Sequence, residues 1–221
     1  MALTNPDWYC SRLTVDDTYR EDGTHVMTPE MIDEERKTGM AEELVQQEYY
    51  CSFAGYMQGS YYSDQLRDAS AQGRITKLPW LASLPVFTFW DIGYGDSTAI
   101  WFGQYINGRR HFIDYYEQSG EAVGHYAKIL KEKPYTYSRH YWPHDGRNHD
   151  WSSSGDSRRD VAEKLGIRPV DIIDRGDIND GIEAGKVWFS QCWFDEGTCR
   201  VGLDALQAYR RDYNTRLNEF K

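Results

Sequence analysis

The stretch VFTFWDIGYGD, residues 86–96, decides the fold of this chain. Its first five residues are β-branched or aromatic, which predicts a buried strand, and Asp91 stands where that strand runs into a glycine-rich turn. A second strand is expected over residues 97–103. Asn107-Gly108 is a strong hairpin signal before a third strand over residues 111–116, so this region predicts an antiparallel three-strand meander.

Downstream of the meander, helices and strands alternate. The expected elements are a helix over 120–133, a strand near 138–142 that ends at Pro143-His144-Asp145-Gly146, a helix that opens at Ser157 and ends at Gly166, a strand over 170–173, a helix over 177–189 and a terminal helix with Leu206, Tyr209, Tyr213 and Leu217 on one face. Short right-handed crossovers would place the fourth strand beside the first. This order predicts an α/β, RNase H-like fold: a mixed central sheet with flanking helices.

The sequence pattern upstream of the meander indicates a separate segment. The expected elements are a helix capped by Thr28 and interrupted at Gly39, a short strand over 49–53, and a helix over 60–72 closed by Gly73. Pro79 and Pro85 interrupt the pattern that follows. We therefore assign residues 1–75 to one segment and residues 76–221 to the α/β domain.

Composition limits the classes of function. The chain has 221 residues, with 25 Lys and Arg against 35 Asp and Glu, and a net charge of −10 disfavours binding of nucleic acid over the whole surface. Two local basic clusters remain: Arg139, His140, His144, Arg147, His149, Arg158 and Arg159, and then Arg210, Arg211, Arg216 and Lys221. No apolar run approaches the roughly 18 residues needed to cross a membrane, and the four cysteines, without a C-x-x-C pair, are expected to be reduced thiols.

Two acidic residues carry the chemistry that this order implies. Asp91 and Asp145 each follow a strand, and the carboxyl ends of neighbouring parallel strands are where open α/β sheets bind ligands. Two carboxylates facing one point repel each other, and a divalent cation relieves that repulsion. Oxygen ligands favour Mg²⁺ or Mn²⁺, and two such ions catalyse in-line displacement at a phosphodiester. Taken alone, either aspartate is more typical of a turn residue than of a functional one.

Four motifs follow one another along the chain: Asp91-Ile92-Gly93-x-x-Asp96-x-Thr98-Ala99, Pro143-His144-Asp145, Ser154-Gly155-x-Ser157-Arg158 and Asp180-Gly181-Ile182-x-Ala184. Together they resemble the nuclease domain of the large subunit of tailed-phage DNA-packaging terminases. Upstream, Gln47-Glu48-Tyr49-x-Cys51-x-Phe53 resembles the segment that ends the ATPase domain of the same family. The order and spacing of these matches cover most of the chain.

The resemblance implies a metal-dependent endonuclease that cleaves concatemeric double-stranded viral DNA during genome packaging, in the cytoplasm of a bacterial host. Asp91 and Asp145 match the first two metal-binding acids, and Asp96 matches a further acid close to the metals. Residues 1–75 would be the end of an ATPase domain with its linker. The portal protein and the small terminase subunit are the implied partners of the full-length protein.

The basic residues near the second acid have two interpretations. His144 would orient a metal ligand or touch phosphate, and three arginines would line the rim: Arg147, Arg158 and Arg159. Asp160 and Glu163 are alternative partners for these arginines. The spacing H-x₃-H-x₄-H of His140, His144 and His149 does not place three imidazoles on one face of a strand, which disfavours zinc. The aromatic residues of segments 90–101 and 188–193 are expected to pack in the core.

This sequence departs from the family pattern at two points. It has no G-x-x-x-x-G-K-[ST] phosphate-binding loop, so we do not expect it to be the motor by itself. The family's third metal-binding acid lies in a C-terminal motif that this sequence does not reach, so we expect a C-terminally truncated nuclease with weakened metal binding. Four residues could substitute for the third acid: Asp174, Asp177, Asp204 and Asp212.

Two alternatives follow from these departures. One is a catalytically incomplete RNase H-like module that binds DNA or docks to the portal or small subunit. The other is a different RNase H-like nuclease, such as a resolvase or a transposase core.

Overall fold

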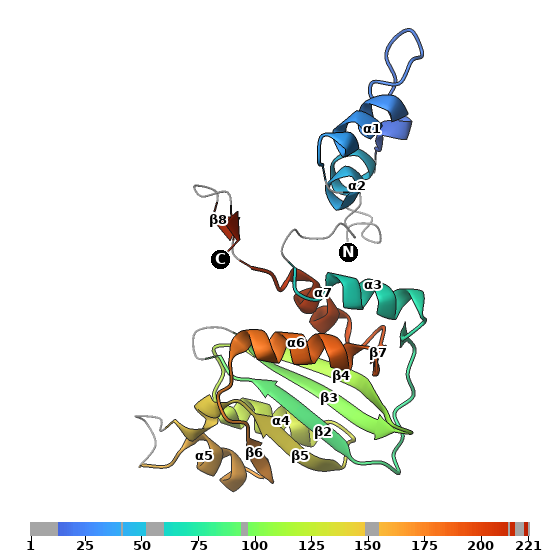
Figure 1. Cartoon of the computed structure of the whole chain (residues 1–221). Coiled ribbons are helices and arrows are strands. Elements are labelled where there is room, and N and C mark those ends of the chain that lie inside the picture. Colours follow the sequence, from blue (N-terminus) through green and yellow to red (C-terminus); the bar gives the residue numbers. More distant parts are fainter. Residues whose placement is uncertain are drawn as a thin grey trace. The chain divides into compact units, whose positions relative to one another are not determined.

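The structure, a computed structural model, describes residues 13–40, 42–51, 60–93, 97–148, 155–211, 213–214 and 219–220. The chain divides into two compact units, Met1–Gln58 and Gly59–Lys221, which we call the N-terminal unit and the α/β domain (Figure 1). This division lies earlier than the boundary at residue 75 expected from the sequence. The reason is that α3 (Ser63–Ala71) and β1 (Ile75–Thr76) belong to the α/β domain: Ala69 lies in its core and β1 pairs with a central-sheet strand.

The N-terminal unit contains short helices. They are η2 (Val15–Asp17), α1 (Pro29–Lys37) and α2 (Glu42–Tyr50). Thr28 caps α1 as predicted, because its hydroxyl accepts a hydrogen bond from the Met31 N–H at 3.4 Å. The predicted strand over 49–53 is wrong at its start, since Tyr49 and Tyr50 end α2, and residues 52–53 lie outside the described residues.

A seven-stranded mixed sheet with the strand order β1-β7-β4-β3-β2-β5-β6 forms the centre of the α/β domain. Its other strands are β2 (Val86–Asp91), β3 (Ser97–Ile106), β4 (Arg109–Ser119), β5 (Tyr137–Trp142), β6 (Val170–Ile172) and β7 (Cys192–Asp195). β2, β3 and β4 form the predicted antiparallel meander, and β5 pairs parallel with β2, as predicted. The short strands β1 and β7 were not predicted.

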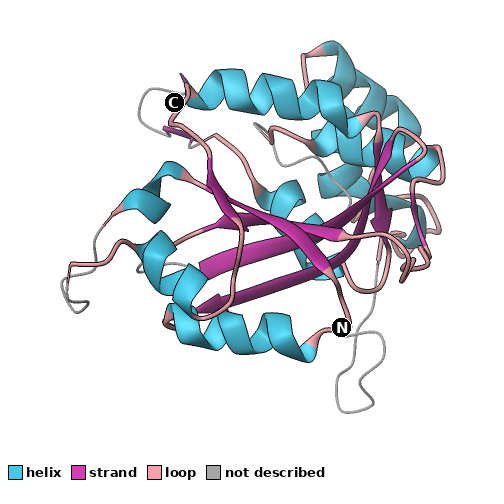
Figure 2. Cartoon of the chain, turned by 90° about the horizontal axis from the view of Figure 1, so that it is seen from below, coloured by secondary structure: helices cyan, strands magenta, loops and turns pink. Residues whose placement is uncertain are grey.

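Helices cover both faces of this sheet (Figures 1 and 2). On one face, α4 (Val123–Glu132) and α5 (Arg158–Lys164) pack over an apolar core that includes Trp90, Phe102 and Trp142. On the other face, α3, α6 (Ile178–Phe189) and α7 (Arg200–Ala208) pack over a second core that includes Trp101, Phe112 and Phe194. No helix in the described ranges is long and apolar enough to cross a membrane.

A β-bulge changes the register between β3 and β4. Gly103 pairs with Phe112 but Phe102 pairs with Asp114, so Ile113 is the extra residue. The bulge turns both Ile113 and Asp114 towards the α4 face. Beyond the bulge, every residue of β4 is shifted by one position relative to an uninterrupted hairpin.

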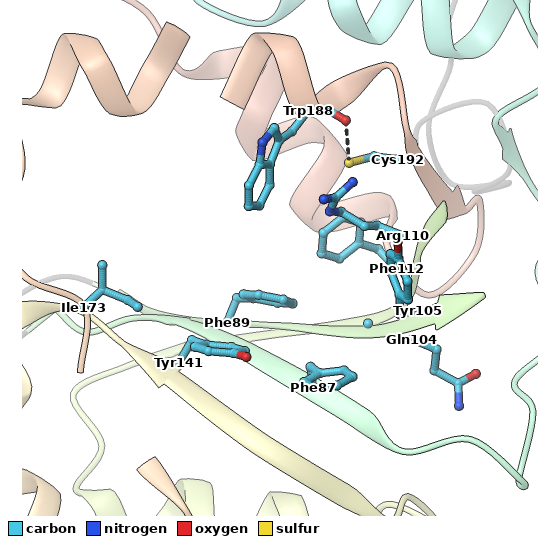
Figure 3. A pocket seen from close by; sticks show the side chains of 11 residues that line it. Phe87, Phe89, Gln104, Tyr105, Arg110, Phe112, Tyr141, Ile173, Trp188 and Cys192 are labelled. Carbon is cyan, nitrogen blue, oxygen red and sulfur yellow. Dashed lines mark hydrogen bonds between the residues drawn. The ribbon is translucent and has the colours of Figure 1, made fainter. Parts of the chain in front are cut away.

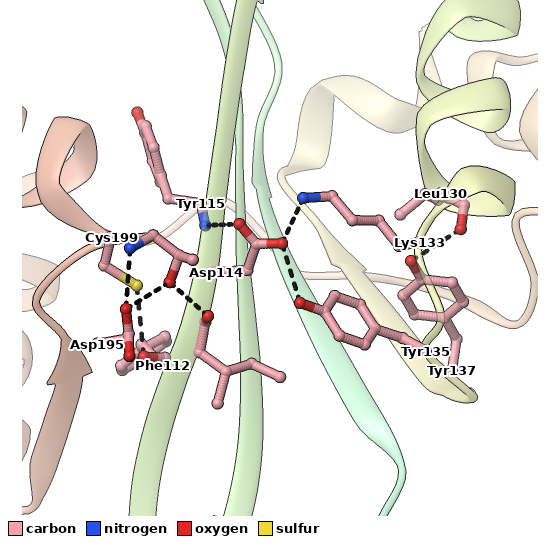
Figure 4. A network of polar contacts seen from close by, with 11 residues as sticks. Phe112, Asp114, Tyr115, Leu130, Lys133, Tyr135, Tyr137, Asp195 and Cys199 are labelled. Atoms are coloured by element: carbon pink, nitrogen blue, oxygen red, sulfur yellow. Dashed lines mark hydrogen bonds and ion pairs between the residues drawn. The ribbon is translucent and has the colours of Figure 1, made fainter. Parts of the chain in front are cut away.

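Asp114 uses this orientation to anchor the end of α4 (Figure 4). Its side chain is 7% exposed and accepts hydrogen bonds from the Lys133 ammonium and, at 3.0 Å, from the Tyr135 hydroxyl. Burial, followed by the charge of Asp114 and this hydrogen bond, raises the pKa of Tyr135 well above its ordinary value. The buried carboxylate is therefore paired and hydrogen-bonded, as a buried charge requires.

Asp195 anchors the turn that leads into α7. Its Oδ1 accepts hydrogen bonds from the backbone N–H groups of Gly197 and Thr198, and its Oδ2 accepts one from the Leu78 N–H at 2.8 Å. Burial would raise the pKa of Asp195, but these hydrogen bonds outweigh it and lower the pKa. The ionised carboxylate therefore joins the turn before α7 to the backbone at Leu78.

The C-terminal region differs from its prediction. The helix α7 ends at Ala208, and residues 213–214 form β8 (Tyr213–Asn214), which pairs with β9 (Glu219–Phe220). Tyr209 and Tyr213 therefore do not continue the helical face of Leu206, so this expectation was wrong. Leu217 lies outside the described residues.

Among the described cysteines, Cys51, Cys192 and Cys199 are free thiols. Burial raises the pKa of Cys192 to about 11 and that of Cys199 to about 12. These two buried thiols are therefore neutral and unreactive at neutral pH. Cys10 lies outside the described residues.

Gly202 allows α7 to lie against the sheet. A Cβ at this position would come within 2.6 Å of the Trp101 ring and 2.7 Å of the Tyr115 ring. Gly181 of α6 is a useful contrast, because a Cβ there would meet nothing within 4 Å.

We predict that Gly202→Ala and Gly181→Ala have opposite effects on the free energy of unfolding. Gly181→Ala should stabilise the domain by about 0.5–1 kcal/mol through helix propensity alone. Gly202→Ala should destabilise it by about 1–2 kcal/mol, because overpacking exceeds the same gain. Urea denaturation of both variants measures the difference, and equal stabilisation by both would contradict the proposed contact of α7 with Trp101.

His140 is a core residue of the α4 face. Its side chain is 1% exposed, and its Nδ1 lies 2.7 Å from the Thr88 hydroxyl, which also accepts a hydrogen bond from Trp90 Nε1. Burial lowers the pKa of His140 from 6.5 to about 4. Because the unfolded chain binds this proton more readily, the stabilisation is present above pH 6.5 and is lost as the pH falls towards 4.

We predict that this histidine makes a large contribution to acid destabilisation. Between about pH 7 and about pH 5 it should reduce the free energy of unfolding by about 2 kcal/mol. His140→Gln should flatten this dependence in urea denaturation series, even though it lowers stability at neutral pH. The control is Val187→Ala at an exposed position of α6, which changes no titratable group and should keep the wild-type slope. An unchanged slope in His140→Gln would disprove the assignment.

Candidate functional site

Asp91 and Asp145 lie at the same end of the central sheet. Asp91 is the last residue of β2, and Asp145 lies in the turn η3 (His144–Arg147), which follows the end of β5 at Trp142. β2 and β5 are parallel neighbours with Phe89 opposite Tyr141, so their carboxyl ends coincide. We call this end of the sheet the carboxylate edge. The position expected for both acids from the element order is therefore observed.

Close packing holds the η3 turn that carries Asp145. Gly146 is buried, and a Cβ there would come within 3.0 Å of the Trp142 ring and 3.3 Å of Ile172. The Asp145 Oδ1 lies 3.3 Å from the His144 Nε2 and 3.3 Å from the Asn148 Nδ2. His144 is thus adjacent to the second acid, as the sequence indicated.

Asp91 is exposed, and among the described residues no side chain donates a hydrogen bond to its carboxylate. Its charge nevertheless acts on two tyrosines. The pKa of Tyr115 is raised by burial first, then by Glu117 and Asp91, and the pKa of Tyr209 is raised by burial, Tyr61 and Asp91. Tyr209 follows α7, so the end of this helix lies within the field of Asp91.

Glu117 is an acid at this edge that the sequence did not indicate. Asp91 pairs with Ala99, and Ala99 pairs with Glu117, so the two acids lie on the same face of three adjacent strands with a small side chain between them. The Tyr115 hydroxyl donates a hydrogen bond to Glu117 Oε2 at 2.6 Å. A hairpin extended from Asn107-Gly108 without the bulge would pair Ala99 with Tyr116. Because the bulge shifts the register by one residue, the sequence pattern alone does not place Glu117 on this face.

The arginines after Asp145 have different surroundings. Arg147 pairs with Asp174 at 2.6 Å, and Arg159 pairs along α5 with Glu163 at 3.0 Å, one of its two alternative partners. The Arg158 backbone N–H donates to the Asn148 carbonyl at 3.0 Å, so the start of α5 lies beside the end of η3. Asp160 instead completes the Ser157 capping box.

The four possible substitutes for a third acid are mostly engaged elsewhere. Asp174 pairs with Arg147, and Asp204 pairs with Arg200 on α7 at 3.2 Å. Asp177 caps α6 by accepting hydrogen bonds from two backbone N–H groups. Asp212 and Asp96 both lie outside the described residues.

The donor set at the carboxylate edge is chemically suited to Mg²⁺ or Mn²⁺, because Asp91, Asp145 and Glu117 offer carboxylate oxygens. Within the described ranges, no group of three or more His, Cys, Asp or Glu side chains is already arranged around one point. Zinc bound by His140 and its neighbours is not supported, since His140 points into the core on the α4 face. His149 lies outside the described residues.

The aromatic residues of the two predicted packing segments separate into two groups. Trp90 is 8% exposed and Trp101 packs in the second core, as predicted. Trp188 is 55% exposed on α6, which a packing role does not explain.

No protein-family model and no curated protein sequence matches this chain. Among solved structures, the large terminase of a thermophilic bacteriophage in complex with ATP-γ-S has a TM-score of 0.51 and 14% identity, over 90% of this chain and 49% of that one. The P22 large terminase nuclease domain has a TM-score of 0.49 and 14% identity, over 63% of this chain and 76% of that one. The large terminase nuclease from thermophilic phage G20c with bound magnesium has a TM-score of 0.49 and 13% identity, over 72% of this chain and 84% of that one.

The comparison with the ATP-γ-S complex confirms the fold. The chain shares its fold with the matched part of that large terminase and spans about half the length of the protein in that complex. The RNase H-like α/β fold predicted from the element order is therefore confirmed.

Proposed function

We propose that this chain carries a divalent-metal-dependent DNA endonuclease of the large-terminase type, which cleaves concatemeric double-stranded viral DNA during genome packaging. The observation that supports it most is the position of Asp91 and Asp145 at the carboxyl ends of neighbouring parallel strands in a terminase-like fold. Open α/β sheets bind their ligands at this end.

The proposed metal ligands are carboxylates. Asp91 and Asp145 are the first two, Asp96 is a further acid of the first motif, and Glu117 is added because its register places it on the face of Asp91. Mg²⁺ and Mn²⁺ both fit such oxygen donors. When bound, such ions lower the pKa of a water and stabilise the leaving oxygen of an in-line displacement.

The other residues of the edge are proposed to orient Asp145 and to bind DNA phosphates. His144, at 3.3 Å from Asp145, restrains that carboxylate towards the ligand position. Arg147 is 56% exposed at the same edge, where it would exchange Asp174 for a DNA phosphate. Arg158 and Arg159, at the start of α5, would extend this phosphate contact along the DNA.

The remaining proposals concern the N-terminal unit, the partners and the site of action of a longer terminase protein. The N-terminal unit, residues 1–58, is proposed to be the end of an ATPase domain, whereas residues 59–75 of the expected segment belong to the α/β domain. The portal protein and the small terminase subunit are proposed as partners. The site of action would be the cytoplasm of a bacterial host.

Nicking of supercoiled plasmid in Mn²⁺ or Mg²⁺ tests this proposal. Asp91→Asn and Asp145→Asn should each lower the rate by more than about a hundredfold, because a metal ion stabilises the transition state by several kcal/mol. Asp64→Asn on α3, an exposed acid that pairs with Arg67 of the same helix, is the matched control and should retain the wild-type rate. Glu117→Gln should lower the rate as well.

Calorimetric titration with Mn²⁺ provides a second readout that does not depend on turnover. Both Asp variants should bind the ion more weakly than the Asp64→Asn control. Nicking that survives in Asp91→Asn and Asp145→Asn would reject the site. DNA binding by the wild type without any nicking would support the catalytically incomplete module instead, and cleavage restricted to four-way junctions would indicate a resolvase.

A further inference from the structure

A cavity of about 620 Å³ lies on the sheet face that carries Asp91, beneath α6 (Figure 3). Its lining includes Phe87, Phe89, Gly103, Arg110, Tyr141 and Trp188. Volumes of this size are typical of sites for small molecules and single chemical groups. We call it the aromatic pocket.

Flat aromatic rings form the floor of the aromatic pocket. The rings of Phe89 and Tyr141 lie nearly parallel, at 14° with centroids 5.3 Å apart, and Phe87 continues the row at 19° and 6.4 Å from Tyr141. Gly103 leaves the floor open, since a Cβ there would fill space 3.5 Å from the Phe89 ring. Phe89 remains 38% exposed, although it lies in the middle of a sheet.

Trp188 and Arg110 form the opposite wall. Trp188 projects from α6 towards the floor, and the Arg110 guanidinium lies 4.4 Å from the centroid of its ring. Gln191 fixes Arg110 by accepting a hydrogen bond at 2.6 Å. Among the described lining residues, Arg110 is the one with a charged side chain, so the pocket combines flat apolar surfaces with a single positive charge.

The aromatic pocket and the carboxylate edge are neighbours on one face of the sheet. Phe89 and Asp91 are two residues apart on β2, so their side chains point to the same face about 7 Å apart along the strand. A group bound on Phe89 would therefore lie next to a strand held at Asp91.

We infer that the aromatic pocket binds one unpaired nucleobase of a DNA strand, stacked on Phe89 and Tyr141, with its phosphate towards Arg110. The choice of DNA as the ligand rests on the proposed function. Exposed rings on a sheet surface are a known platform for base stacking, and every base offers a flat π-face, so such binding tolerates any sequence. A base within an intact duplex has both faces covered by its stacked neighbours, so the domain should prefer DNA that is locally unpaired.

An apolar peptide segment would fit this pocket less well. It would offer no anion to the Arg110 guanidinium, and its contact with apolar side chains would not require rings that are nearly parallel. A nucleotide matches both features, because its flat ring and its anionic phosphate are joined in one unit.

Fluorescence anisotropy in EDTA, where no cleavage occurs, tests the inference. The probes are a duplex with a central run of unpaired thymines and the same duplex fully paired, with dTMP as a competitor. The wild type should bind the unpaired probe about 5- to 150-fold more tightly, as expected for stacking of one base. Trp188→Ala and Phe89→Leu should reduce this preference, whereas Val187→Ala, on the neighbouring exposed residue of α6, should keep it.

Thermal melting establishes that each variant is folded before its affinity is compared. Equal affinity of the wild type for both probes, or an unchanged preference in both Trp188→Ala and Phe89→Leu, overturns the inference. Displacement of the unpaired probe by dTMP at equal concentration would overturn the assignment to a DNA strand in favour of free nucleotides. Asp145→Asn should keep the preference while losing nicking, which separates failure of the pocket from failure of the proposed nuclease.

Discussion

The parallel pairing of β2 with β5 is the constraint on which the rest of the α/β domain depends. It brings together two strands that are separated in the chain by β3, β4 and α4, and it makes their carboxyl ends coincide. On one face, this pairing places the Thr88 hydroxyl 2.7 Å from the His140 Nδ1 within a closed core. On the other face, it aligns Phe89 with Tyr141 and brings Asp91 to the same edge as the turn that holds Asp145.

The bulge at Ile113 has consequences on both faces. On the α4 face, it directs Asp114 inwards, where Lys133 and Tyr135 neutralise and satisfy its charge. On the opposite face, it shifts Glu117 into register with Asp91. One inserted residue therefore couples the attachment of α4 to the composition of the carboxylate edge, which explains how a bulge can be tolerated in the middle of a long hairpin.

The two faces of the sheet are closed to different degrees. The α4 face is filled by large buried side chains, whereas α6 leaves the rings of Phe89 and Tyr141 open below Trp188. Leaving this apolar surface exposed costs free energy, because burying it elsewhere would stabilise the domain. Such exposure next to the proposed metal ligands is expected of a binding surface rather than of a core.

The sequence by itself determined the meander, the crossover strand beside it and the position of Asp91 and Asp145, because hydrophobic periodicity and turn residues act locally. It did not predict β1 and β7, which are too short to show a period and exist because each pairs with a distant strand. The end of α7 at Ala208 was also missed. Only the tertiary structure decided the position of Glu117 beside Asp91 and the opening at Trp188, since one depends on a register shift between strands and the other on how far a helix stands from a sheet.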